Sequence, residues 1–176
     1  MNRRTFAKAS FLGILFAAVV GPVSILTGCS AATIAQAIIN SFGKILSFLQ
    51  SSGIVTDPVL VATAQAALTA FQAAFDAFQN GTGTPEKLAA AAQAALNAVQ
   101  AFFEATNIGG PIALVIVTLA QIILSTLESF LPTPPATFKL AGKSLHIPPV
   151  QRTKAQFISD WNNACVSAGH PEMRIK

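Results

Sequence analysis

Polar residues recur along residues 31–131 in narrow stripes with a helical spacing. The clearest stripe consists of Gln65, Thr69, Gln72, Asp76 and Gln79, and large apolar residues take another face of the same segment at Leu68, Phe71, Phe75 and Phe78. Intervals of three and four residues match the turn of an amphipathic α-helix. Similar stripes are formed by Gln36, Asn40, Lys44 and Ser47, by Gln93, Asn97, Gln100 and Glu104, and by Thr118, Gln121, Ser125 and Glu128.

The breaks between these stripes carry helix-start signals. Asp57, Thr84 and Gly110 each stand directly before a proline, which places a capping residue ahead of proline at the first helical position. The pattern predicts helices over 31–51, 58–79, 85–106 and 111–131. Because the connections are short, neighbouring helices should run antiparallel, so we expect an all-α, up-down four-helix bundle.

The four predicted helices share an internal repeat of about 28 residues. An Ala-Gln pair followed by small or apolar residues begins at Ala35, Ala64, Ala92 and Ala120. The middle two units are the most similar, since residues 62–77 match residues 90–105 at 11 of 16 positions. The repeat predicts a common architecture for the four helices.

A C-terminal region, residues 132–176, should fold differently. Its first residues, 132–135, include three prolines and cannot continue a helix. Alternating residues on either side of Ala141-Gly142-Lys143 predict a small β-hairpin. Thr153 and Gln156 fit a capping box that begins a last helix. The apolar face of that helix, which we expect to pack on the bundle, consists of Phe157, Ile158, Trp161 and Cys165.

Residues 1–28 have the layout of a signal peptide, with a basic start, a long apolar run and a short closing motif. The closing residues are Leu26, Thr27, Gly28 and Cys29. This segment resembles the signal of bacterial lipoproteins, which implies removal of residues 1–28 and attachment of Cys29 to a diacylglycerol. The mature chain would then divide into residues 29–131 and 132–176. An ordinary signal peptide or an uncleaved anchor is the alternative.

The first residues also resemble a twin-arginine export motif. Arg3, Arg4, Phe6 and Lys8 match that motif, whereas Asn2 and Ala7 depart from it, so the export route stays open. Ser30 follows the cysteine at a position where some inner-membrane lipoproteins carry Asp. The resemblance therefore favours the outer membrane, facing the periplasm, in a cell that has one.

Charge is divided unevenly along the mature chain, whose eight Lys and Arg against seven Asp and Glu leave a net charge of +1. Residues 29–131 have two lysines and five carboxylates, a net charge of −3, whereas residues 132–176 have six basic and two acidic residues, a net charge of +4. The small total gives no argument for nucleic acid. Besides Cys29 only Cys165 remains, which excludes a disulfide framework within one chain.

The bundle lacks the residues that common catalytic and cofactor sites need. Residues 30–131 contain no His, Cys, Arg, Met, Trp or Tyr, so a bundle di-iron site and haem ligation there are excluded, and we expect neither cofactor nor metal. We interpret the five carboxylates as solvated surface groups, most of them on polar stripes: Asp57, Asp76, Glu86, Glu104 and Glu128.

The C-terminal region offers two features with possible chemistry. Cys165 and His170 are five residues apart across a helix end and could form a nucleophile–base pair, although a buried structural thiol explains Cys165 better because it lies on the same face as Trp161. Four basic residues could meet anionic lipid headgroups or could balance the acidic bundle: Lys139, Lys143, Arg152 and Lys154.

These observations favour a non-enzymatic, lipid-anchored envelope protein that acts as a binding or scaffolding bundle. Its partners would be the membrane, through Cys29, and a protein or a second copy of the chain. A second hypothesis is a membrane-active assembly, in which the bundle or Ile112–Leu127 alone enters the bilayer; that segment is slightly shorter than the roughly 20 residues of a free span. A third is an enzyme that uses Cys165 and His170.

Overall fold

A computed structural model describes residues 32–54, 56–106, 108–133, 138–140 and 143–176. Cys29 and the predicted signal peptide lie outside the described residues. The elements in chain order are α1 (Ala32–Ser51), α2 (Pro58–Gln79), α3 (Pro85–Ala105), α4 (Pro111–Glu128), β1 (Phe138–Leu140), β2 (Lys143–Leu145), α5 (Lys154–Ser167) and η1 (Pro171–Met173). The predicted helices are confirmed, and the largest shift in a boundary is at α4, which ends three residues earlier than expected.

The helices begin where the sequence signals stand. The Asp57 carboxylate accepts a hydrogen bond from the Val59 backbone N–H at 2.8 Å, and the Thr84 hydroxyl accepts one from the Lys87 N–H at 3.4 Å. The turn before α3 also requires Gly83, because a Cβ at this position would lie 2.7 Å from the backbone nitrogen of Phe78. The residues before α2 and α3 therefore serve as helix caps.

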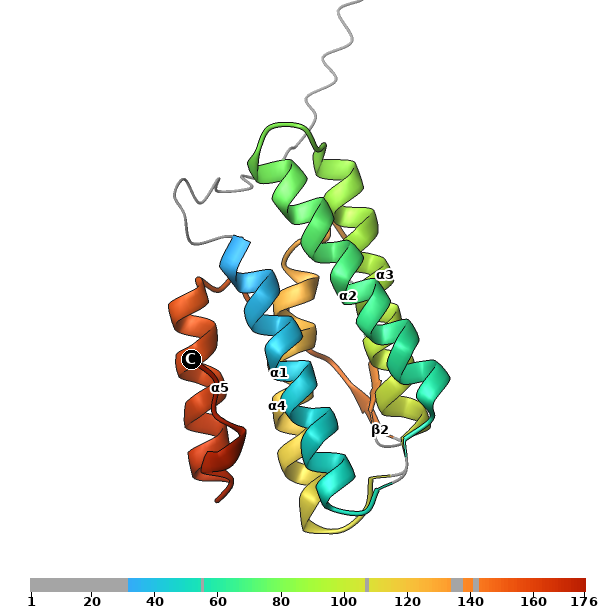
Figure 1. Ribbon diagram of the computed structural model, residues 1–176, viewed down its shortest axis with the longest axis vertical. Coiled ribbons are helices and arrows are strands. Elements are labelled where there is room, and N and C mark those ends of the chain that lie inside the picture. The colour runs from blue at the N-terminus through green and yellow to red at the C-terminus, as the bar shows by residue number, and fades with distance from the viewer. Residues whose placement is uncertain (1–31, 55, 107, 134–137, 141–142) are drawn as a thin grey trace, which may run out of the picture.

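The four long helices pack as a bundle, and successive helices run in opposite directions (Figure 1). Helix α1 contacts α2 and α4, and α3 contacts the same two helices. Phenylalanine rings fill the centre: the ring of Phe42 lies 5.1 Å from that of Phe102 and 6.3 Å from that of Phe103. Past the end of α4, the Phe130 ring meets those of Phe71 and Phe75. The core thus joins residues from every long helix.

The Ala-Gln positions have equivalent environments in all four helices. The alanines are fully buried at Ala35, Ala64, Ala92 and Ala120. Each following glutamine is exposed or half-buried. Because a side chain larger than alanine would separate the helices, these alanines permit close approach of the backbones inside the bundle.

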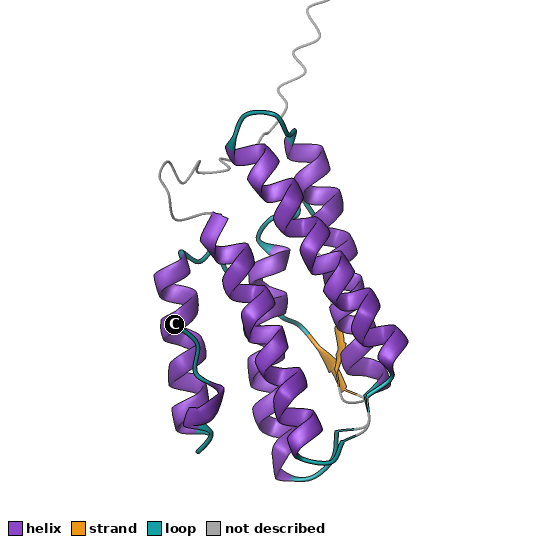
Figure 2. Ribbon diagram, viewed as in Figure 1, coloured by secondary structure: helices purple, strands orange, loops and turns teal. Residues whose placement is uncertain are grey.

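The C-terminal region packs on the outside of this bundle. Strands β1 and β2 pair antiparallel, with Phe138 opposite Leu145, and β1 lies against α3 (Figure 2). Residues 141–142, which join the strands, lie outside the described residues. Helix α5 begins with the predicted capping box of Thr153 and Gln156 and packs on α4 and α1. Its apolar face is buried at Phe157, Trp161 and Cys165.

Among the described residues, one helix is long and apolar enough to cross a membrane, judged by length and composition alone. It is Pro58–Gln79, and 22% of its most apolar window is buried inside the protein. The segment Ile112–Glu128 is apolar but shorter. That segment packs within the bundle, and its largest exposed apolar side chain is Leu114.

Candidate functional site

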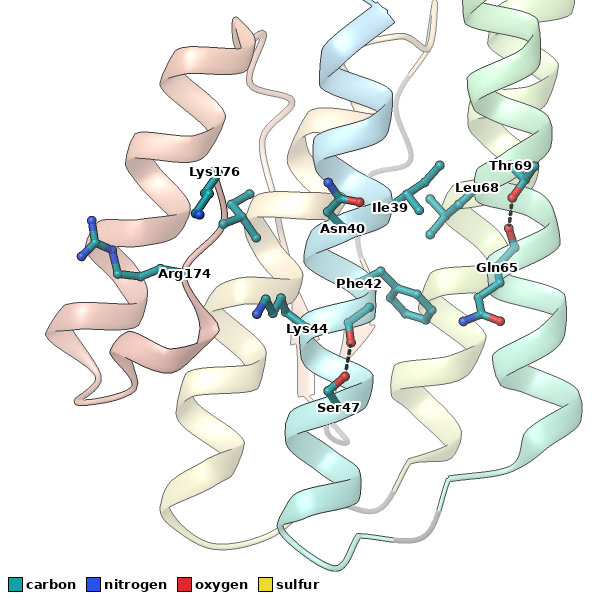
Figure 3. Close-up of a pocket in the computed structure, with 12 residues that line it drawn as sticks. Ile39, Asn40, Phe42, Lys44, Ser47, Gln65, Leu68, Thr69, Arg174 and Lys176 are labelled. Carbon is teal, nitrogen blue, oxygen red and sulfur yellow. Dashed lines mark hydrogen bonds between the residues drawn. The ribbon is translucent and has the colours of Figure 1, made fainter.

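The polar stripes of α1 and α2 face one another across a groove. Near the N-terminal end of α1, the Gln72 side-chain amide donates a hydrogen bond to the Gln36 amide oxygen at 3.1 Å. Beyond this bond the two helices and the last three residues of the chain enclose a hollow of about 840 Å³ (Figure 3). Asn40 and Lys44 line it from α1, and Gln65 lines it from α2. Residues that the sequence places on two separate stripes therefore share one site.

Apolar side chains form the deeper part of this groove. Phe42 and Leu68 are each 1% exposed, and Ile175 is buried as well. Ile39 is half-buried at the side of the groove. The groove therefore combines a closed apolar floor with a polar rim.

Two hydroxyl groups in the groove are bound to their own helices. The Ser47 hydroxyl donates to the Gly43 carbonyl oxygen at 3.1 Å, and the Thr69 hydroxyl donates to the Gln65 carbonyl oxygen at 2.9 Å (Figure 3). The Asn40 amide oxygen accepts a hydrogen bond from Gln36 at 3.0 Å. These bonds leave the amide N–H groups of Asn40 as hydrogen-bond donors at the rim.

Three cationic side chains line the groove, and no carboxylate side chain does. They are Lys44, Arg174 and Lys176. The ion pairs found within the described part of the chain, Arg152 with Asp160 and His170 with Glu172, involve none of the three. The groove is therefore electropositive although the bundle itself carries a net negative charge.

Hydrogen bonds to α5 fix the C-terminal residues beside the groove. The Trp161 indole N–H donates to the Met173 carbonyl oxygen at 2.8 Å. Asn162 binds both sides of the Ile175 backbone, because its amide N–H donates to the carbonyl at 3.0 Å and its amide oxygen accepts from the N–H at 2.9 Å. Ile175 is buried while Arg174 and Lys176 are exposed. This alternation exposes both cationic side chains, and the Arg174 guanidinium is directed away from α1 (Figure 3).

Sequence reasoning identifies half of this site. The stripe residues on α1 and α2 follow from helical periodicity, but Gly43, Arg174 and Lys176 carry no recognised motif. The only signal from the C-terminal cations is the net charge of +4 over residues 132–176. Nothing in the pattern indicates that these residues return to α1, because that contact depends on how α5 docks.

The second predicted feature, Cys165 with His170, has a different geometry. The Cys165 side chain is fully buried, and burial raises the pKa of its thiol to about 11. His170 meets it through the backbone, since its N–H donates to the Cys165 carbonyl oxygen at 2.8 Å. The His170 ring instead lies 2.9 Å from the Glu172 carboxylate and packs edge-on against Phe48. This arrangement favours a structural thiol, because a nucleophile needs the thiolate and access to solvent.

The interpretation of Glu128 as a solvated surface group is wrong. Its side chain is fully buried, and neither carboxylate oxygen has a hydrogen-bond partner within the described residues. Burial raises the pKa of the carboxyl group to about 7, and the charge of nearby His146 opposes that shift. Burial occurs because the C-terminal region covers this end of α4.

Arg152, one of the four basic residues that could meet lipid headgroups or balance the acidic bundle, is bound inside the protein. Its guanidinium donates to the hydroxyl oxygens of Ser125 at 2.7 Å and Thr126 at 3.0 Å, and to the Asp160 carboxylate at 2.8 Å. Its side chain is only 12% exposed. Arg152 therefore holds α5 to α4. The side chains of Lys139 and Lys143 lie outside the described residues.

The predicted lipid-attachment residue, Cys29, lies outside the described residues, three positions before α1 begins. In the parts of the chain that the structure describes, no three His, Cys, Asp or Glu side chains are grouped so that they could hold a metal ion. No protein-family model, no curated protein and no solved structure matches the chain.

Proposed function

We propose that this protein is a lipid-anchored component of the bacterial cell envelope that acts by binding rather than by catalysis. Cys29 attaches it to the membrane, with the outer membrane favoured. The bundle, built from four related units of about 28 residues, presents a surface to a ligand, a protein partner or a second copy of the chain. The lipoprotein-like signal that ends at Cys29 supports the attachment.

The groove between α1, α2 and residues 174–176 carries the binding part of this proposal. This groove is a preformed hollow with an apolar floor and polar groups at its rim, and ligand-binding sites commonly have this composition. Its α1 residues begin at Ile39, about two helical turns after Ala32. An anchor at Cys29 would therefore hold the protein from the end of α1 and leave the groove accessible.

Metabolic labelling tests the anchor. Cells that express the full chain receive a palmitate analogue, and the purified protein is assayed for incorporation. We expect labelling of the wild type and of Cys165→Ala, and none of Cys29→Ala, because only Cys29 stands at the end of a lipoprotein-like signal. Equal labelling of wild type and Cys29→Ala would refute the anchor.

A second candidate function is a membrane-embedded assembly, and the exposure of α2 favours it. This helix has the length and hydropathy of a membrane span and is mostly unburied. Val59 on its first turn is 69% exposed. Alkaline carbonate extraction of residues 30–176, exported behind an ordinary cleavable signal peptide, separates the candidates. This chain should be released if the lipid alone holds the protein, and should stay in the membrane pellet if helices are embedded.

A further inference from the structure

We propose that the groove binds an amphiphilic anion, whose phosphate or carboxylate group is held by Lys44 and Lys176. Its short apolar part would lie along α1 beside Gly43. This inference rests on the proposed binding function and names the class of ligand. The shared chemistry is that of a lipid headgroup and of a free amphiphile, so the experiment below has to distinguish those two sources.

The charge of the groove is the first reason. Residues 32–131 contain only two cations, and one of them, Lys44, faces the groove. Arg174 and Lys176 reach the same hollow from a segment about 130 residues further along the chain. Charge-assisted hydrogen bonds to phosphate or carboxylate are stronger than neutral ones. Lys44 and Lys176, with no carboxylate side chain in the lining between them, therefore complement an anion.

The hydrogen-bonding groups of the groove point to the same ligand. The hydroxyl hydrogens of Ser47 and Thr69 are donated to backbone carbonyl oxygens of their own helices. The Asn40 amide oxygen is occupied by Gln36, so its N–H groups remain. With those N–H groups and the ammonium groups of Lys44 and Lys176, the rim is richer in donors than in acceptors. A ligand that offers only acceptors, as an ionised phosphate does, fits this rim.

Gly43 is the second, independent reason. Glycine inside a helix costs about 1 kcal/mol relative to alanine, yet a Cβ on Gly43 would meet nothing within 4 Å. Packing inside the protein therefore gives no reason for glycine at this position. Because Gly43 lines the groove, its missing side chain leaves the α1 backbone open to a bound molecule. Ile39 and Leu68 lie beside it and would contact the apolar part.

Calorimetric titration of the full chain, purified from cells and mixed with phosphatidylcholine nanodiscs, tests this inference whether or not Cys29 is lipidated. The probe is hexyl phosphate, and hexanol and inorganic phosphate test its two halves; empty discs correct for partitioning. We expect hexyl phosphate to bind more tightly than either half. Lys44→Gln and Lys176→Gln should each weaken binding about tenfold, because each removes a charge-assisted contact.

Gly43→Leu tests the groove itself, because Gly43 lines it and a Cβ at this position would meet no atom of the protein within 4 Å. We expect loss of hexyl phosphate binding with an unchanged thermal transition. Lys87→Gln and Ala94→Leu are matched controls on α3 and should bind like the wild type. Absence of binding by the wild type, or equal binding by Gly43→Leu, would overturn the inference.

A second arm identifies the source of the anion. Part of the phosphatidylcholine is replaced by phosphatidylglycerol. Weaker hexyl phosphate binding in these discs assigns the groove to a bilayer headgroup, and unchanged binding assigns it to a free ligand. Both results support an anion site. Failure of Cys29 labelling would refute the anchor alone, whereas failure of the titration would refute the ligand class alone.

Discussion

Helices α3 and α4 carry the same polar stripe in sequence but use it in opposite ways. On α3 the stripe is in contact with solvent, and its side chains form hydrogen bonds with one another. Gln93 donates to Asn97 and Gln100 donates to Glu104, both at 2.8 Å. The positions 28 residues after Asn97 and Gln100 are Ser125 and Glu128 on α4. Both are buried, at 3% and 0% exposure.

The difference comes from what covers each helix. The C-terminal region crosses the end of α4, where the Val150 N–H donates to the Ser125 carbonyl oxygen and Arg152 binds the Ser125 hydroxyl. On α3, Asn97 and Glu104 stay exposed among the residues that the structure describes. A polar stripe thus marks a face of a helix, and the rest of the chain decides whether that face meets water.

The largest effect should come from removing the cover of α4. Phe157 is fully buried and its ring stacks on Trp161. Phe157→Ala should lower the free energy of unfolding by about 3–5 kcal/mol, because it leaves a cavity under α5. Val166→Ala, at a 55% exposed position on the same helix, should change it by less than about 0.5 kcal/mol. Urea unfolding of residues 30–176 measures both, and equal small effects would show that α5 does not seal α4.

Glu128 should make the stability of the protein depend on pH. In the unfolded chain this carboxyl group titrates near 4.5, and in the folded protein its pKa is about 7. Between these values the folded state keeps a proton that the unfolded state has released, so raising the pH favours unfolding. The contribution is fully present below pH 4.5 and is lost above pH 7, and the difference amounts to roughly 3 kcal/mol.

Glu128→Gln removes this titration, and Glu104→Gln on the exposed stripe is its control. We expect the variant at position 128 to gain stability over the wild type as the pH rises from 4 to 8, by an amount on the order of 2–3 kcal/mol. The Glu104 variant should follow the wild-type curve. Urea unfolding at several pH values gives the comparison, and parallel curves for all three proteins would mean that Glu128 is solvated.

The smallest effect should distinguish Ser125 from Asn97. Ser125→Ala should cost about 1 kcal/mol, because it leaves one guanidinium bond of the part-buried Arg152 unmade while Thr126 keeps another. Asn97→Ala should cost only a few tenths of a kcal/mol, since its amide is exposed. Thermal unfolding of the two variants side by side resolves the difference. A larger loss of stability for Asn97→Ala than for Ser125→Ala would contradict the assignment of an exposed stripe on α3 and a buried stripe on α4.

Much of the fold could be predicted from local sequence. Proline after a capping residue fixes where α2, α3 and α4 begin, and the period of the apolar residues fixes which faces meet. The capping box at Thr153 is confirmed for the same reason. These features depend on residues within one or two turns of each other, so a short stretch of sequence is enough to predict them. The groove could be predicted only in part, as the stripes of α1 and α2.

The sequence by itself therefore determined the helices, their boundaries and their polar stripes, because backbone hydrogen bonding, capping and periodic burial act locally. Only the tertiary structure decided that the Glu128 side chain is buried and that the Arg152 guanidinium binds side chains of α4. It also decided that Arg174 and Lys176 line the same groove as Lys44. The position of Arg174 and Lys176 depends on the docking of the chain end on α5 through Trp161 and Asn162. Contacts between segments far apart in sequence arise from shape and burial in three dimensions, and no pattern along the chain encodes them.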